Sequence, residues 1–423
     1  MVSVAAIVHS VARIWLEFHG VIDRKDVEVN SALEILGLTE SERRSRGAEW
    51  TAREIAQQPT LWPELAHRVS ADDRLREYLS PFLADPALRI VCAGAGTSAY
   101  VGECLAPALA RMGRRVDAVA TTDIVASPEA SLARDVPTLV VHFARSGNSP
   151  ESVAALHLAE RHIDRCAHLV ITCNPDGNLI RQAEKMSRVH SIVLPDACND
   201  RGFAMTSSFS GMLLAAAQAL EAIKRSPQRI ENLAESGDGV LTRQVLKAKE
   251  LVEMRFDRVA FLGSNELKGV ARESALKMLE LTDGQVVSLA ESPLGFRHGP
   301  KTIVNGSTLV VFFMSNDRYT RQYDEDLLQE ICADGQAGHV IALTAQASDG
   351  GTVDMIELGL ERDEEEIPSD LELCLPYVTF AQLLALHRSL SLGLTPDNPN
   401  ASGTVSRVVR GVSIHPYPHS GVL

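Results

Sequence analysis

Short apolar runs alternate with longer amphipathic segments through the middle of the chain. The run LRIVCAG (88–94) is followed by a turn of small residues and then by a segment with helical periodicity. The order of apolar strand, polar turn and helix returns at residues 138–161 and 168–185, and HSIVLP (190–195) gives another strand. Strands that alternate with helices over such distances predict a parallel, doubly wound sheet of the α/β class.

The same series begins again at residue 258. Residues 258–281 match the first unit and residues 307–330 match the second, while apolar strands follow at 339–345 and 352–359. The offset of roughly 170 residues is too long for a solenoid repeat. We therefore predict an internal duplication, with two similar α/β sandwiches packed face to face.

Helical patterns surround and connect these two series. Residues 51–65 predict a helix that Pro59 should end or kink, because proline lacks the backbone N–H that a helix interior needs. Further helices are expected before residue 84, at 206–252 and near 373–393. The expected parts are an N-terminal helical segment (1–84), a first domain (85–225), a second domain (226–395) and a C-terminal tail (396–423).

The composition is that of a globular protein, and it limits the possible partners. Hydrophobic residues make up 45% of the 423 residues and charged residues 23%, and the formal net charge is −14. No block of basic residues occurs, so nucleic-acid binding is not expected, because it needs a basic face that displaces counterions. No apolar run reaches the roughly 18 residues of a membrane span, and the apolar N-terminus lacks the basic start of a secretory signal.

Cysteine and histidine spacing predicts neither a disulfide framework nor a metal site. The seven cysteines are odd in number, scattered and without a CxxC pair, which is typical of buried free thiols in a reducing compartment. We therefore expect a cytoplasmic protein. The 13 histidines show no HxH pair, and the single HxxxH spacing, His415 and His419, is interrupted by two prolines in the tail, so the sequence gives little support for zinc.

A turn at the first predicted strand end carries residue types that bind phosphate. Gly96, Thr97 and Ser98 follow the buried strand and open a helix, at the edge of a parallel sheet where ligands bind. Free N–H groups at a helix start, together with two hydroxyls, suit a phosphate. The sequence GAGTSA is neither a complete G-x-G-x-x-G fingerprint nor a Walker A loop, and tight-turn packing alone would also explain it.

A second turn of the same kind closes the neighbouring strand. RSGNS offers Arg145, Ser146, Asn148 and Ser149, and it too precedes a helix. Two such turns on neighbouring strands favour a phosphate site more strongly than either turn does alone. Neither turn is built to hold a whole dinucleotide, so a phosphorylated small metabolite is the expected ligand.

Residues 271–300 carry candidate acid/base chemistry. At about 100° per residue, Glu273, Lys277 and Glu280 share one helix face, and a loop with His298 follows. Glu280 is the best candidate for a general base, with Lys277 as its cationic neighbour and His298 as a second acid/base group. A solvated helix face and a loop histidine bonded to backbone are the alternative interpretations. No G-x-S-x-G elbow supports a hydrolase triad.

These motifs together resemble the sugar isomerase (SIS) fold, a flavodoxin-like α/β domain that commonly occurs in duplicate. The resemblance runs from TAREIAQQP to SRVVRGVSIHP and is carried by CAGAGTSA, FARSGNSPES, ITCNP, DRGFAMTSS, ARESALKMLELT, GFRHGPK and NPNASGTVSRVVRGV. The chain looks most like AgaS-type tagatose-6-phosphate ketose/aldose isomerases, which are described as galactosamine-6-phosphate deaminases. The isomerase half of glucosamine-6-phosphate synthase is a more distant relative.

The resemblance implies a role for each matching residue. Glu280 stands where the relatives have the glutamate that moves a proton between C2 and C1. His298 resembles the histidine that helps to open the pyranose ring, which in the synthase comes from the neighbouring subunit. Lys277 and Glu273 match charged residues of the same helix, and Asp200 stands where the synthase has a glutamate beside the substrate. The hydroxyls that hold the sugar phosphate match Thr97, Ser98, Ser146 and Ser149.

The chain departs from the synthase at several of these positions. Ala144 and Arg145 replace serine and glutamine, and Gln285 replaces a histidine. Arg410 aligns with a C-terminal lysine of the synthase; an arginine cannot act as a neutral amine, but it can bind an oxyanion. Val2 stands where a glutaminase domain has its nucleophilic cysteine, so we expect the chain to release ammonia rather than to install it.

We therefore predict an isomerising deaminase that converts an amino-hexose 6-phosphate, galactosamine 6-phosphate favoured, into tagatose 6-phosphate and ammonia. No metal or organic cofactor is expected, because imine chemistry on the substrate itself activates the C–H bond. The alternatives are a plain aldose/ketose phosphosugar isomerase or deglycase, and a non-catalytic sugar-phosphate sensor. The resemblance also implies a homodimer or larger homo-oligomer, with the site at a subunit interface and the C-terminal tail docked nearby.

Overall fold

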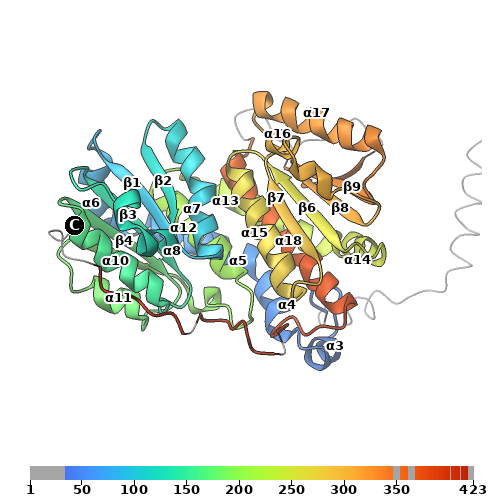
Figure 1. Cartoon of the computed structure of the whole chain (residues 1–423), viewed down its shortest axis with the longest axis horizontal. Coiled ribbons are helices and arrows are strands. Elements are labelled where there is room, and N and C mark those ends of the chain that lie inside the picture. Colours follow the sequence, from blue (N-terminus) through green and yellow to red (C-terminus); the bar gives the residue numbers. More distant parts are fainter. Residues whose placement is uncertain (1–33, 346–352, 361–366, 401, 410, 418–423) are drawn as a thin grey trace, which may run out of the picture.

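The protein contains two β-sheets, each made of parallel strands and flanked by helices, as Figure 1 shows. The computed structural model describes residues 34–345, 353–360, 367–400, 402–409 and 411–417. Each sheet has five strands. This arrangement confirms the predicted α/β class and the internal duplication into two similar domains.

The two sheets share one strand order. In space the first sheet runs β2 (Arg115–Ala120), β1 (Arg89–Gly94), β3 (Thr138–Ala144), β4 (Cys166–Thr172) and β5 (Val189–Val193). The second runs β7 (Val287–Glu291), β6 (Arg258–Gly263), β8 (Thr308–Phe313), β9 (His339–Thr344) and β10 (Asp354–Glu357). All neighbouring strands pair in parallel. The chain therefore places corresponding turns at corresponding sheet edges.

The edge strands β2 and β7 are absent from the sequence prediction. β2 alternates exposed Arg115 and Asp117 with half-buried positions, and β7 has no fully buried residue. The predicted strands β1, β3 and β4 are almost wholly buried apolar runs. A short strand that is open on one side carries too little apolar pattern to be recognised beside such runs.

Helices flank both sheets and connect them. The N-terminal helices are α3 (Glu40–Ser45), α4 (Glu49–Ala56), α5 (Gln58–Ser70) and α6 (Asp73–Leu83). The first domain adds α7 (Thr97–Arg111), α8 (Thr121–Ala126), α9 (Pro128–Ser131), α10 (Pro150–His162), α11 (Asn178–Ala183), η1 (Asp196–Cys198) and α12 (Ser207–Ala219). The remainder comprises α13 (Pro227–Arg243), α14 (Val245–Glu253), α15 (Glu266–Leu281), α16 (Pro293–Phe296), η2 (Pro300–Ile303), α17 (Arg318–Asp334) and α18 (Asp370–Ser391). None of these described helices is both long and apolar enough to cross a bilayer.

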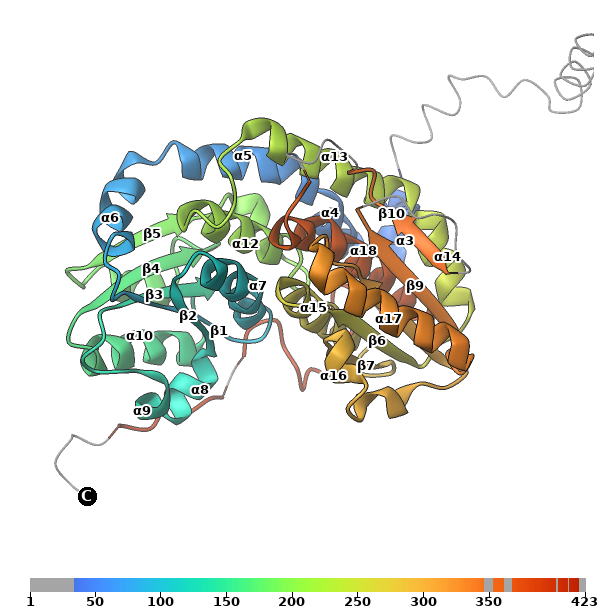
Figure 2. The ribbon, with the colours of Figure 1, turned by 90° about the horizontal axis from the view of Figure 1, so that it is seen from above.

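Helix α18 lies at the centre of the molecule. Every residue from Asp370 to Leu390 is buried, and the helix packs against α15, α13, α14, α4 and α7. A helix that is buried all round belongs inside a core rather than on a surface. One continuous hydrophobic cluster joins residues of both sheets through α7, α12, α15 and α18. Figure 2 shows these helices between the two sheets, so the cluster is a core that both domains share.

Helices α7 and α15 approach each other closely at Gly269. A Cβ atom there would lie 2.6 Å from Cys104 Sγ and 2.7 Å from the Cys104 backbone nitrogen. Only a glycine permits this approach, because real Cβ atoms do not come so close to backbone. The contact places the start of α7, at Thr97, beside the C-terminal turns of α15, which carry Lys277.

The duplicated turns that precede α7 and α15 differ in strain. Gly96 has φ 55° and ψ −129°, and Asn265 takes the corresponding place with φ 51° and ψ −119°. Glycine tolerates this conformation, whereas a Cβ makes it cost of the order of 1–3 kcal/mol. We expect Asn265→Gly to raise the free energy of unfolding in urea by about 1 kcal/mol, after the larger chain entropy of glycine is allowed for. A loss of stability would show that the asparagine side chain contributes more than the strain costs.

Candidate active site

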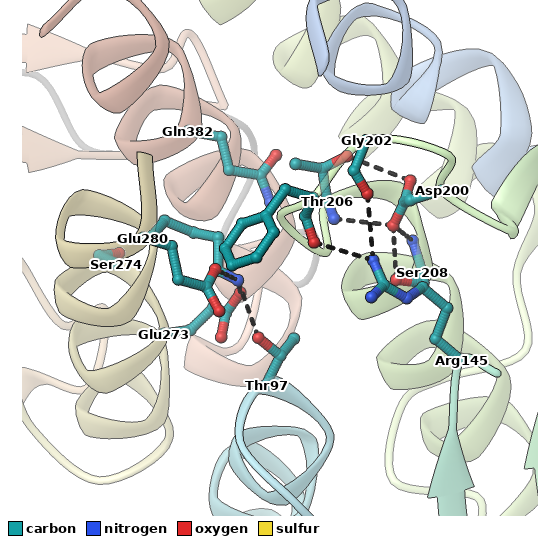
Figure 3. A network of polar contacts seen from close by, with 12 residues as sticks. Thr97, Arg145, Asp200, Gly202, Thr206, Ser208, Glu273, Ser274, Glu280 and Gln382 are labelled. Atoms are coloured by element: carbon teal, nitrogen blue, oxygen red, sulfur yellow. Dashed lines mark hydrogen bonds and ion pairs between the residues drawn. The ribbon is translucent and has the colours of Figure 1, made fainter. Parts of the chain in front are cut away.

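The candidate site lies where the carboxyl end of the first sheet faces helix α15. Figure 3 shows Thr97, Arg145 and Asp200 from the first domain opposite Glu273 and Glu280 from the second. The structure therefore brings together residues that are far apart in the sequence and that were singled out by two separate motifs.

Lys277 connects the two domains at this point. Its Nζ donates a hydrogen bond to Thr97 Oγ1 at 2.9 Å and another to Glu280 Oε2. Glu273 Oε1 lies 3.5 Å from the same Nζ, which is an ion-pair distance. Lys277 and Glu273 are fully buried, whereas the Glu280 side chain is 24% exposed. Of the three, Glu280 is the one that a substrate can reach.

The electrostatic balance of this group follows from its burial. Burial raises the pKa of Glu273 to about 8, and the charge of Lys277 offsets this only in part while Glu280 adds to it. Burial acts to lower the pKa of Lys277, but the two carboxylates outweigh it and hold that pKa above its usual range. Lys277 therefore stays charged at neutral pH, and Glu273 is the carboxyl that keeps a proton.

The raised pKa of Glu273 predicts a pH-dependent stability. The unfolded carboxyl titrates near 4.5 and the folded one near about 8, so the folded state binds more protons between these values. This contribution is fully present below about pH 4.5 and is lost as pH rises through about 8. Between pH 5 and pH 9 we expect the free energy of unfolding to fall less in Glu273→Gln than in the parent protein, with a difference of a few kcal/mol. Urea titrations at several pH values measure this difference. Parallel curves for the two proteins would contradict the assignment.

The predicted phosphate-binding turns lie where the sequence placed them. Thr97 and Ser98 are buried in the first turn of α7. Ser149 caps α10, because its Oγ accepts the Ser152 N–H at 3.3 Å. Ser146 Oγ accepts the N–H of Asn148 at 3.2 Å, and Asn148 is exposed. Two helix starts with hydroxyls thus lie at the ends of adjacent strands β1 and β3, as an anion site requires.

The guanidinium of Arg145 is hydrogen-bonded to backbone carbonyl groups. It donates to the carbonyl oxygens of Phe203 at 3.2 Å and Arg407 at 2.7 Å. Burial, followed by the charge of Arg407, lowers the pKa of Arg145, while the charges of Asp200 and Glu280 act in the opposite direction. Arg145 therefore fastens the tail segment around Arg407 to the first domain, within electrostatic range of Glu280.

Asp200 is likewise satisfied within the protein. Its oxygens accept the backbone N–H groups of Thr206 at 2.8 Å, Ser207 at 3.1 Å and Ser208 at 2.9 Å, and the hydroxyls of all three residues. This carboxylate fills the N-terminus of α12, where an anion is favoured by the helix dipole. A direct contact with substrate, as the resemblance implies, would have to compete with these bonds.

His298 lies apart from Lys277, Glu273 and Glu280. His298 is exposed in the loop after α16, and within the described residues no hydrogen bond or ion pair links its ring to Glu280. Arg410 lies outside the described residues. The described part of one chain thus assembles Glu280, Lys277 and the turns that are predicted to bind phosphate, but not the predicted ring-opening residue.

Two residues that support the site were not predicted from the sequence. Glu54 of α4 accepts the Gly202 N–H at 3.1 Å, and burial together with Asp200 raises the pKa of Glu54 to about 7. Arg407 donates to the Asp200 carbonyl at 2.9 Å. Both lie in segments that carry the family resemblance, TAREIAQQP and SRVVRG, but only their contacts show what they do.

Comparisons with known proteins show the family to which the chain belongs. The SIS domain family matches residues 82–222. D-galactosamine-6-phosphate deaminase AgaS of Shewanella sp. (strain ANA-3) is 43% identical over 88% of this chain and 93% of its own length. A Streptomyces coelicolor relative, given the same deaminase name with a provisional qualifier, is 50% identical over 86% of this chain and 95% of its own. The crystal structure of tagatose-6-phosphate ketose/aldose isomerase from Escherichia coli is similar with a TM-score of 0.80 and 39% identity, over 87% of this chain and 97% of that one.

Proposed function

Because this chain belongs to the AgaS family of SIS-domain proteins, we propose that it is an isomerising deaminase of an amino-hexose 6-phosphate. The favoured reaction converts galactosamine 6-phosphate and water into tagatose 6-phosphate and ammonia. The observation that carries the proposal is the junction of Lys277 with Thr97 and Glu280, because it sets a reachable carboxylate beside the phosphate-binding helix start.

The reaction begins with the open-chain aldehyde form of the sugar. Glu280 removes the proton from C2, and the electron pair forms the C1–C2 double bond of an enolamine. Glu280 then returns the proton to C1, which leaves an imine at C2. Water adds to this imine and ammonia departs, so that a ketone remains at C2. During this isomerisation O1 takes up a proton from solvent water and the amino nitrogen gives one up to it, so C1 ends as a hydroxymethyl group and the protons balance.

Lys277 and the helix starts supply the electrostatics. Lys277 is held charged beside the carboxylate of Glu280, so it keeps Glu280 oriented and offers positive charge beside the developing enolate oxygen. Thr97, Ser98, Ser146, Asn148 and Ser149 hold the phosphate at the starts of α7 and α10.

His298 opens the sugar ring from a neighbouring copy of the chain. Support comes from its exposure and from the lack of a described contact with Glu280 in its own chain. Mixing inactive Glu280→Gln and His298→Ala proteins under conditions that exchange subunits should then restore roughly a quarter of the activity, as expected for random assembly of a symmetric dimer. If no activity returns although the subunits exchange, each chain supplies its own histidine.

The reducing cytoplasm is the proposed compartment. All seven cysteines are free, and six of them are buried. Free buried thiols persist where glutathione and thioredoxin keep proteins reduced.

Ammonia release decides between deamination and plain isomerisation. Purified protein should release ammonia from galactosamine 6-phosphate faster than from glucosamine or fructosamine 6-phosphate. A protein that interconverts tagatose 6-phosphate with its aldose but frees no ammonia from any amino sugar would be a plain aldose/ketose isomerase. A protein that binds these sugars without either reaction would be a sensor.

A further inference from the structure

A second cluster of reactive side chains lies in the first domain, away from the site above. The geometry points to a binding site for zinc or a similar divalent ion, formed by Glu160, Cys166 and His168. Cys166 is the first residue of β4, whereas the phosphate-binding turns follow the last residues of their strands. Because all strands are parallel, the two sites lie at opposite ends of the sheet, about 20 Å apart along a seven-residue strand.

The strand alternation and the path of the chain explain why the three side chains meet. Cys166 and His168 are two residues apart on a strand, so both side chains point to the face that α10 covers. Glu160 lies in the last turn of α10, which returns the chain to that face. The spacing is neither CxxC nor HxxxH, which explains why it gave no metal signal in the sequence.

The distances between the ligand atoms suit a tetrahedral ion. His168 Nε2 lies 3.4 Å from Cys166 Sγ and 2.9 Å from Glu160 Oε2, and all three ligand atoms lie within 4.8 Å of one another. Zinc bonds of about 2.3 Å to sulfur and about 2.0–2.1 Å to nitrogen put the two atoms about 3.5 Å apart. The Glu160 side chain is 40% exposed, so a small movement of it would admit the ion and leave a fourth position for water.

A buried neighbour fixes the orientation of the histidine ligand. His142 Nε2 lies 3.0 Å from His168 Nδ1, and both rings are buried. With His168 Nδ1 engaged in this way, its Nε2 is the atom left to face Cys166 and Glu160. Metal-binding histidines are commonly held through the second ring nitrogen in this manner.

Binding would tie three elements of the first domain together. The Cys166 thiol must lose its proton to solvent to become a ligand, so ion binding releases one proton. The ion then joins the end of α10 to β4 and, through His142, to β3. Its expected effect is on the stability of the domain that carries the phosphate site, because no ligand reaches Glu280.

Cobalt(II) tests the site with a spectroscopic readout. Titration of metal-free protein should give one bound cobalt per chain and a near-ultraviolet charge-transfer band from a cobalt–thiolate bond. Cys166→Ser should abolish that band, whereas Cys332→Ser, which removes the half-buried thiol of α17, should leave it unchanged. Zinc should displace the cobalt and raise the Tm of the parent protein but not of Cys166→Ser.

A second variant keeps the test valid if Cys166→Ser fails to fold. Glu160→Gln changes a partly exposed side chain and should weaken cobalt binding at least about tenfold. The proposal is overturned if cobalt and zinc fail to bind stoichiometrically, or if the band survives in Cys166→Ser. It is overturned equally if Glu160→Gln binds as tightly as the parent. Ammonia release by the metal-free protein is measured separately, so neither proposal depends on the other.

Discussion

Replacing Glu280 with glutamine is expected to slow ammonia release by about 10²- to 10⁴-fold while substrate binding stays near normal. Glutamine keeps the shape of the side chain and can still accept a bond from Lys277, but it cannot take the proton from C2. The turns that we propose to bind the phosphate lie on the other domain and do not depend on this carboxylate. Single-turnover ammonia release and calorimetric binding of galactosamine 6-phosphate measure the two effects separately.

The matched control for this experiment is Glu253→Gln, at the exposed end of α14. It makes the same chemical change far from the proposed chemistry, so its turnover should equal that of the parent. Near-normal turnover in Glu280→Gln would exclude Glu280 as the group that moves the proton.

Replacing Lys277 with methionine is expected to lower the free energy of unfolding by about 3–5 kcal/mol. Methionine fills a similar volume, but it leaves the partly exposed Glu280 without its cation and the buried Thr97 without its donor. Glu273 would then be held still more firmly in its protonated form. Urea unfolding at neutral pH measures the loss.

Lys268→Met on the same helix is the control for this change. Lys268 pairs with Glu291, but both side chains are partly exposed at 42% and 26%. Such pairs contribute no more than about 1 kcal/mol. A Lys277→Met protein that loses no more than Lys268→Met would show that burial of the ion pair does not strengthen the domain junction.

Local periodicity made much of the fold predictable. The buried strands β1, β3 and β4 are continuous apolar runs, and α15 shows its polar face through spacing alone, so both could be recognised without tertiary information. The edge strands β2 and β7 could not, because their register is set by pairing with β1 and β6 rather than by their own pattern.

The partners of the site residues were less predictable than the residues themselves. Nothing in RSGNS indicates that Arg145 would be bound to carbonyl oxygens of Phe203 and Arg407, because those contacts depend on where segments 58 and 262 residues later come to lie. Asp200 resembles a substrate contact by alignment, yet its carboxylate fills the start of α12. Residue type and spacing therefore identify candidate chemistry, whereas only packing shows which groups are already occupied.

The central position of α18 has a consequence for biosynthesis. The ribosome makes residues 1–369 before this helix, and domains tend to fold as they emerge. Without α18, however, the hydrophobic cluster that both sheets share lacks the apolar side chains of this helix. The apolar faces of α7 and α15 that pack against α18 then remain exposed to solvent. Although the chain is a tandem duplication, its two halves should reach their native packing together and late. Nascent chains that stop before residue 370 should accordingly be held by chaperones or degraded.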